Sequence, residues 1–467
     1  MKKFLTIIAL CLLALVICVP TSSYAAIDYQ FSQEFDITAI TEENIRQDII
    51  DFVYGEGATT FDDNGERVDR TAATDGELKA RDYLLSELRE IFGLAADEDL
   101  SATNYVQTQE INFQTSAFAA PVTTYNVIGY KKAVIDTTDY IVIGAHYDNF
   151  YGYADGMTSA DAVKSHGIYD NASGVVGVLN IAKLLQTKDL NVDVYYAFFG
   201  AEELGKYGSR GFYDGFVKKY EGDMKLMINL DSIGNGDNLY MYADEIKTVH
   251  EDYFAEASKF LKKNGGAGYA FFEEIKTSPK NKKVDYFISS GEIDYSHMGL
   301  NSDNSSFMGE GNNVITFFSG DWGGNNIGMY ESSKNENLMH TKNDNLVQVD
   351  KLYGDVFYAR IKQVVYTCAT VVSQDDFIKT MDESSKTSGS YIFFTNSMYI
   401  NIILAALIII AYVIFRTYIK KYKLVQKDGS WDKLKKAVLE NDIDAIYQKP
   451  EEDVTEIVIE DDKKDNE

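Results

Sequence analysis

The sequence predicts an α/β protein: a three-layer α/β/α sandwich around a mixed, mostly parallel central sheet, followed by one C-terminal transmembrane helix. Dense apolar runs of the kind buried in the middle of a sheet occur at residues 140–145, 194–199, 224–230 and 312–318. Segments with helical character alternate with several of these runs, which is the element order of layered α/β folds. Residues 398–415 form an apolar stretch long enough to cross a bilayer.

The predicted elements follow one another through the N-terminal four fifths of the chain. In the second helical segment, Ala80, Tyr83, Leu84, Leu88 and Ile91 fall on one side of a helix. Helices are expected at residues 40–54, 74–92, 175–185, 249–263 and 353–372. Strands are expected at residues 105–113, 124–131, 140–145, 194–199, 224–230, 239–242 and 312–318.

Composition narrows the classes of function. The 467 residues include 72 acidic and 44 basic residues, for a net charge of −28. Binding to a nucleic-acid backbone requires clustered Lys and Arg, so the acidic excess argues against a nucleic-acid partner. Outside the first 26 residues the only cysteine is Cys368, which cannot close an intrachain disulfide. Its place in a helical segment favours a buried packing role over reactivity.

Residues 1–26 have the pattern of a secretory signal peptide. Lys2 and Lys3 form a charged start, residues 4–19 are apolar, and Ser23-Tyr24-Ala25 offers a cleavage site of small residues. We therefore expect the following domain to be exported.

The apolar stretch at residues 398–415 is followed directly by basic side chains, beginning with Arg416. The positive-inside rule places this basic flank in the cytoplasm, although a buried core helix is the alternative interpretation. The sequence thus predicts a single-pass cell-membrane protein with its large domain extracellular. Its expected parts are a signal peptide (1–26), an extracellular domain (27–375), a linker (376–397), a transmembrane helix (398–415) and a cytoplasmic tail (416–467).

Histidine and acidic residues stand where several apolar runs end. His146 and Asp148 follow the run at 140–145, and this His-x-Asp order can place an imidazole as a ligand with the carboxylate behind it. A partly exposed histidine at the start of a loop is the alternative. Glu202 and Glu203 follow the run at 194–199, although pairs of glutamates are also common on solvated helices.

Two further aspartates have similar positions. Asp170 stands just before the helix at 175–185, where Asp170 or Asn171 could instead be an ordinary helix N-cap. Asp231 follows the run at 224–230 and could be a plain turn residue. With His340 in the segment Met339-His340-Thr341-Lys342-Asn343-Asp344, the candidate set is His146, Asp170, Glu202, Glu203, Asp231 and His340.

Imidazole and carboxylate ligands without cysteine suit zinc, and less often manganese or cobalt. The two histidines with any three of these four carboxylates are already too many for one open tetrahedral site. They suit two metal ions that share a bridging carboxylate.

The chain also resembles a known family over about residues 40–370. The matching motifs are GAHYD, YDNASGVVGVL, FFGAEELGKYGSRGF, INLDSIG and MHTKND, and they occur in the family order. On these motifs the chain is similar to the co-catalytic two-zinc exopeptidases, which include bacterial leucyl aminopeptidases and, more distantly, glutamate carboxypeptidase.

The resemblance implies a metal-dependent aminopeptidase that acts on peptides with a free N-terminus. Residues 27–375 would then be a zinc peptidase domain. It implies two zinc ions, one held by His146 and Asp231, the other by Glu203 and His340, with Asp170 as the bridge. It further implies that Asp148 orients His146, that Glu202 is the general base, and that the peptide bond between Asp170 and Asn171 is cis.

The chain departs from the family pattern at two points. Asn304 follows Ser302-Asp303 where the family often has histidine, and the tyrosine that often binds the oxyanion has only Tyr295, or alternatively His297, as candidates. His166, His250 and Asp161 match no family position and are interpreted as structural or solvated. Two alternatives stay open: a glutaminyl cyclase, which shares the fold with one zinc ion, and a non-catalytic surface receptor on the same fold.

Overall fold

The computed structural model describes residues 30–32, 35–36, 38–55, 70–95, 98–116, 118–152, 163–236, 238–243, 249–264, 302–308, 312–320, 338–382, 408–409 and 412. The chain divides into two compact units, Met1–Ser390 and Tyr391–Glu467. All elements considered below belong to the first unit.

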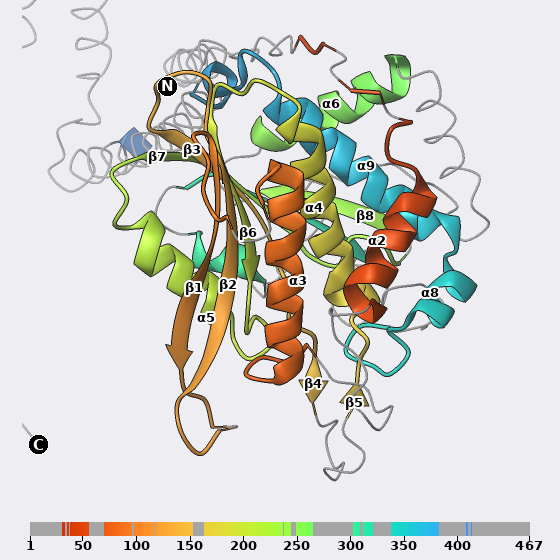
Figure 1. Cartoon of the computed structure of the whole chain (residues 1–467). Coiled ribbons are helices and arrows are strands. Elements are labelled where there is room, and N and C mark those ends of the chain that lie inside the picture. Colours follow the sequence, from red (N-terminus) through yellow and green to blue (C-terminus); the bar gives the residue numbers. More distant parts are fainter. Residues whose placement is uncertain are drawn as a thin grey trace, which may run out of the picture. The chain divides into compact units, whose positions relative to one another are not determined.

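A seven-stranded mixed sheet runs through this unit (Figure 1). Its four central strands β6, β3, β7 and β9 are mutually parallel. β2 pairs antiparallel with β1 and β6, and β8 pairs antiparallel with β9, so the parallel part of the predicted sheet is limited to its centre. The order is β1 (Asn104–Phe113), β2 (Val122–Lys131), β6 (Asp193–Phe199), β3 (Asp139–His146), β7 (Asp223–Leu230), β9 (Val314–Gly320) and β8 (Asn238–Ala243). A separate short hairpin joins β4 (Tyr151–Gly152) to β5 (Val163–Lys164).

Helices cover both faces of the sheet, which confirms the predicted three layers. Ile141 and Ile143 of β3 belong to one core cluster with the helices α2, α3, α4, α6 and α9. Tyr140 and Val142, which point to the opposite face, belong to a second cluster with Phe212 of α5. The helices are α2 (Glu42–Tyr54), α3 (Asp75–Phe92), α4 (Ser173–Gln186), α5 (Tyr207–Phe212), α6 (Val249–Asn264), α8 (Leu346–Leu352) and α9 (Asp355–Val372), with shorter turns η2 (Ile168–Ala172), η3 (Tyr213–Val217) and η6 (Asp303–Ser306).

Local sequence explains where the first helices begin and end. Thr41 caps α2 by accepting a hydrogen bond from the backbone N–H of Asn44, whose side chain accepts the N–H of Thr41 in return. Thr74 caps α3 by accepting the backbone N–H of Glu77, and α3 ends at Gly93, whose φ of 65° suits glycine.

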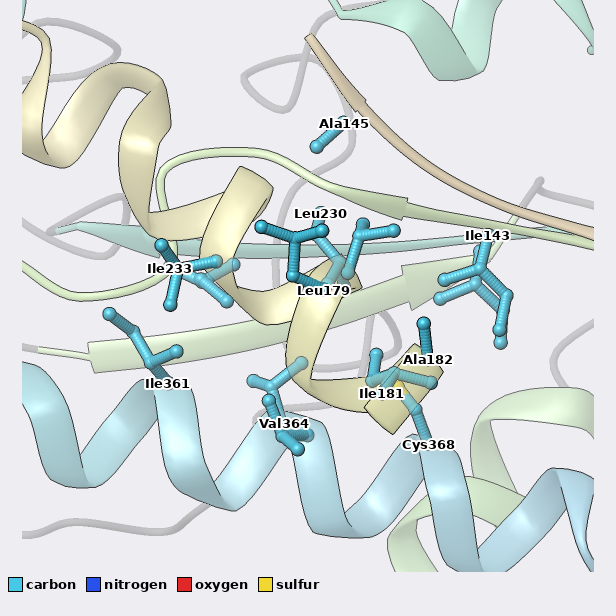
Figure 2. Close-up of a cluster of buried hydrophobic side chains, with 14 of the residues drawn as sticks. Ile143, Ala145, Leu179, Ile181, Ala182, Leu230, Ile233, Ile361, Val364 and Cys368 are labelled. Atoms are coloured by element: carbon cyan, nitrogen blue, oxygen red, sulfur yellow. The ribbon is translucent and has the colours of Figure 1, made fainter. Parts of the chain in front are cut away.

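α4 is almost wholly apolar and lies between the sheet and α9. Figure 2 shows its residues Ile181 and Ala182 close to Val364 and Cys368 of α9, whereas Leu179 lies near Leu230 of β7. A helix buried on all sides has no polar stripe, which accounts for its continuous apolar sequence. Cys368 is fully buried in this packing, as predicted.

All twelve helices and strands expected from the sequence are present, with bounds that shift by no more than a few residues. The predicted signal peptide lies outside the described residues. So does the predicted transmembrane segment, apart from Ile408, Ile409 and Tyr412. Within the described part of the chain, no helix is both long enough and apolar enough to cross a bilayer.

Candidate metal centre

The parallel strands end at one edge of the sheet and bring the candidate residues together there. His146 is the last residue of β3 and lies opposite Phe199, the last residue of β6. Gly144 of β3 lies opposite Asn229 of β7, so Asp231 just after β7 reaches the same edge. The carboxyl edge of an open α/β sheet is where ligands commonly bind.

Asp170 lies between the two histidines. Its Oδ1 is 3.2 Å from Nε2 of His146, and its Oδ2 is 3.1 Å from Nε2 of His340. Asp231 Oδ1 is 3.6 Å from the same His146 nitrogen, and Glu203 Oε2 is 3.1 Å from the same His340 nitrogen. Oδ1 of Asp170 therefore faces the pair His146 and Asp231, and Oδ2 faces the pair His340 and Glu203.

These contacts define two groups with the composition of metal sites. His146, Asp170 and Asp231 form one group, and Asp170, Glu203 and His340 form the other. Within each group the possible ligand atoms lie within 4.8 Å of one another. Imidazole nitrogens and carboxylate oxygens at such spacing fit a pair of divalent ions with Asp170 between them. Glu203 Oε1 is buried and has no hydrogen-bond partner among the described residues, as expected of an oxygen that binds a metal ion.

The tautomer of His146 suits metal binding. Its Nδ1 lies 3.2 Å from the backbone carbonyl of Asp148 and 3.6 Å from the Asp148 carboxylate. Because a carbonyl oxygen only accepts, Nδ1 must carry a proton in this contact, so in the neutral imidazole the lone pair is on Nε2, which faces Asp170 and Asp231. The orientation of His146 thus depends on the main chain of Asp148 as well as on its side chain.

The carboxylate of Asp148 has a second set of partners. Its Oδ1 accepts the backbone N–H of Glu202 at 3.0 Å, and its Oδ2 accepts the backbone N–H of Glu203 at 3.2 Å. Asp148 is fully buried, so these bonds satisfy a charge that is removed from water. One carboxylate therefore holds the turn that carries both glutamates.

Glu202 and Glu203 are neighbours in sequence with different surroundings. Glu203 belongs to the group around His340, whereas Glu202 belongs to neither group. Burial raises the pKa of Glu202 well above its usual range, with His146 opposing this shift. Burial and the nearby charge of Asp170 raise the pKa of Glu203 to about 7, against the effect of His340. Glu203 thus lies within a metal group, as expected of a ligand, and Glu202 lies outside both groups, as expected of a base.

The carboxylates of this cluster raise the pKa of both histidines. Burial alone would lower the pKa of His146, but the carboxylates of Asp148, Asp170 and Asp231 raise it well above its usual value. Burial opposes the same effect at His340, where Asp170 and Glu203 raise the pKa to about 11. A divalent cation would compete with protons for these imidazole nitrogens.

The backbone near the candidate residues is unusual. Ala201, Ser232 and His340 have φ angles of 52°, 57° and 57°, a region that residues other than glycine rarely adopt. Such conformations cluster at functional sites, where the surrounding structure holds them. The peptide bond between Asp170 and Asn171 is cis, as expected.

The structure contradicts the simpler interpretations of His146, of the two glutamates and of Asp170, whereas Asn171 does make a capping hydrogen bond. His146 is 1% exposed and is not a loop histidine at the surface. The glutamates lie in the turn before α5, not on a solvated helix. Asn171, not Asp170, accepts the N–H of Gly174 in the first turn of α4. The Asn171 amide also donates to Leu230 O at 2.9 Å and thereby ties the Asp170 turn to the end of β7.

Three residues near the centre had no assigned role in the sequence analysis. Phe150 stacks on the ring of His340 with centroids 4.2 Å apart. Asp303 is fully buried, and burial raises the pKa of its carboxyl group to about 7. Asp344 accepts the backbone N–H groups of Tyr169 and Asp170. The motif MHTKND contains Asp344, but its buried contacts with a distant segment could not be predicted from hydrophobic periodicity.

The remaining candidates are less central. His166 lies away from both metal groups, with Nδ1 2.5 Å from the hydroxyl of Tyr54, which agrees with a structural role. Asn304 is buried, and its amide contacts Met308 Sδ at 3.6 Å. Asp161, the side chain of His250, Tyr295 and His297 lie outside the described residues.

Comparison with known proteins identifies several similar chains. The model of Peptidase family M28 matches residues 126–365, just over half of the chain. Leucine aminopeptidase 2 of Trichophyton equinum is 36% identical over 113 residues, which are 24% of this chain and 20% of that protein. Aminopeptidase YwaD of Bacillus subtilis is 31% identical over 129 residues, or 27% and 26% of the two chains. The match thus spans about a fifth to a quarter of the length of these relatives.

Among solved structures, a Zn-dependent exopeptidase from Parabacteroides distasonis is 17% identical, covers 72% of this chain and 98% of its own, and has a TM-score of 0.48. A glutaminyl cyclase from Tannerella forsythia is 18% identical, covers 72% and 99%, and has a TM-score of 0.47. These two likenesses do not distinguish one activity from the other.

Proposed function

Because the chain belongs to peptidase family M28, we propose that it is a zinc aminopeptidase that hydrolyses the N-terminal peptide bond of peptides with two zinc ions. His146, Asp231 and Asp170 would hold one ion, and Glu203, His340 and Asp170 would hold the other. The observation that carries the proposal is the position of Asp170, whose two oxygens face two different histidines at 3.2 and 3.1 Å.

The chemistry divides between the ions and the side chains. A bound pair of zinc ions would lower the pKa of the attacking water and polarise the scissile carbonyl. Glu202 accepts a proton from the attacking water and returns it to the leaving amine. Burial raises the pKa of Glu202 above that of an ordinary glutamate, which is the direction in which enzymes tune a carboxylate for general acid–base work. Asp148 accepts the backbone N–H of Glu202 and thereby fixes the turn from which the Glu202 carboxylate would reach the attacking water.

Two alternatives are separated by their metal content and products. A glutaminyl cyclase would need one zinc ion, whereas the described residues offer two complete ligand groups. A non-catalytic receptor would have no need for the partly buried Glu202 beside these groups.

The test is zinc analysis of the purified protein together with a panel of aminoacyl-anilides. We expect two zinc ions per chain and hydrolysis that stops when a chelator removes them. One zinc ion with cyclisation of peptides that begin with glutamine would favour the cyclase. Two bound ions without any turnover across the panel would favour the receptor. The panel would also reveal the preferred side chain.

We further propose that the protein is anchored in the cell membrane with the peptidase domain outside. The support is the signal-like residues 1–26 and the apolar residues 398–415 with their basic flank. Protease treatment of intact cells is expected to release a large fragment that contains the metal centre. Protection of this domain, combined with cleavage of the C-terminal tail, would contradict the proposed topology.

A further inference from the structure

Asp344 is a buried carboxylate that lies outside the proposed ligand set but in the same turn as a proposed ligand. It follows His340 by four residues and is fully buried, whereas His340 is 44% exposed. The turn is closed by hydrogen bonds from Thr341 N to Leu338 O and from Asp344 N to Thr341 O, both 3.1 Å long. His340 and Asp344 are therefore held in one short, bonded segment.

The other hydrogen bonds of Asp344 to described residues all lie in the segment that carries Asp170. Its Oδ1 accepts the backbone N–H of Tyr169 at 2.8 Å. Its Oδ2 accepts the backbone N–H of Asp170 at 3.1 Å and lies 3.4 Å from the hydroxyl of Ser165. Its backbone carbonyl accepts the N–H of His166 at 3.0 Å. One residue thus joins two segments that are about 175 positions apart in sequence.

A carboxylate is specifically suited to this arrangement. It is an acceptor at both oxygens, so it can bind two converging N–H groups at once. A side-chain amide offers one acceptor oxygen and two N–H donors, so one of the two backbone N–H groups would face another donor. Because the site is buried, water cannot readily satisfy the group left without a partner.

We propose that Asp344 is a positioning residue that holds Asp170 and His340 at the separation needed to bind one metal ion between them. The inference rests on the proposed two-zinc centre and adds a residue that contacts neither the ions nor the substrate. It explains how the 3.1 Å approach of Asp170 Oδ2 to His340 Nε2 is maintained although His340 itself is half-exposed. The competing explanation is that Asp344 only stabilises the fold of its loop.

The test compares Asp344→Asn with Asp350→Asn in the full-length protein. Asp350 is an aspartate of the neighbouring helix α8 that binds Arg46 at 2.8 Å and the hydroxyl of Tyr358, so its loss removes hydrogen bonds without touching the Asp170 segment. Zinc affinity is measured by competition with a chromogenic chelator. We expect Asp344→Asn to weaken the binding of one zinc ion about 10–100-fold, the usual effect of removing a partner that orients a ligand. Asp350→Asn should leave both affinities unchanged.

The same measurements identify failure. If Asp344→Asn lowers the unfolding temperature of the metal-free protein but binds both zinc ions as tightly as wild type, Asp344 only stabilises its loop. If wild type binds two ions and the variant is unchanged, this inference alone is overturned. If wild type binds no zinc, the proposed function is wrong, and the inference about Asp344 is then wrong as well.

A measurement on the wild-type protein covers the case in which Asp344→Asn does not fold. Hydrogen exchange is followed in a peptide that contains Tyr169 and Asp170, from the full-length protein without metal. We expect both amides to be protected, because Asp344 binds them in the absence of zinc. Rapid exchange of these amides in the metal-free protein would overturn the proposal.

Discussion

Replacing Glu202 with glutamine is expected to lower kcat by about 10²–10⁴, the usual loss for removing a general base, while both zinc ions and the fold are retained. Glutamine has nearly the same shape and keeps the backbone N–H that Asp148 accepts. Its amide cannot take a proton from the attacking water. Substrate binding should change little, because the lost interaction belongs to the transition state.

Glu203→Gln is the matched control, since the two residues share one turn and one anchoring carboxylate. Glu203 lies 3.1 Å from His340 within the second metal group, so this variant should lose zinc. Steady-state kinetics and zinc analysis of both variants provide the comparison. Near wild-type kcat in Glu202→Gln would refute the proposed base even if both ions were present.

Asp170→Asn is expected to lose both zinc ions, whereas Asp231→Asn should retain one. Asp170 contributes an oxygen to each metal group, and Asp231 contributes to only one. An asparagine can present one oxygen but not two, so at least one ion would meet an N–H donor at the bridging position. Because Asp170 is common to both groups, its replacement should weaken both ions, whereas Asp231→Asn leaves Asp170 in place for the second ion.

Zinc analysis after dialysis decides between these expectations, and circular dichroism shows whether each variant is folded. Two ions in Asp170→Asn would rule out the bridging role. Equal zinc losses in the two aspartate variants would show that the two halves of the centre are not independent in the way the geometry suggests.

The elements were predictable from sequence because their patterns are local. The apolar runs that became β3, β6, β7 and β9 are continuous because both faces of these strands are covered. The antiparallel edges could not be read in the same way, because the pairing of β8 with β9 depends on contacts between distant segments.

The candidate site was partly predictable for a related reason. Parallel strands end at one edge of the sheet, and His146, Glu203 and Asp231 lie at or just after the ends of three such strands. Their proximity therefore follows from the α/β element order. Asp170 and His340 belonged to the same candidate set, but neither directly follows an apolar strand, and their roles as bridge and ligand came only from the family resemblance. The role of Asp344 depends on hydrogen bonds to the backbone N–H groups of Tyr169 and Asp170. Because backbone groups are the same in almost every residue, the sequence does not reveal these bonds.

The two bonds from Asp148 to the glutamate turn also matter for redesign. A metal centre transplanted into another scaffold is usually specified by its ligands and its base. Here those two glutamates are held by a third carboxylate just after β3, through main-chain N–H groups that any residue except proline could supply. The glutamate turn and Asp148 therefore form one transferable unit, and a graft that omitted Asp148 would carry the right side chains on an unanchored backbone.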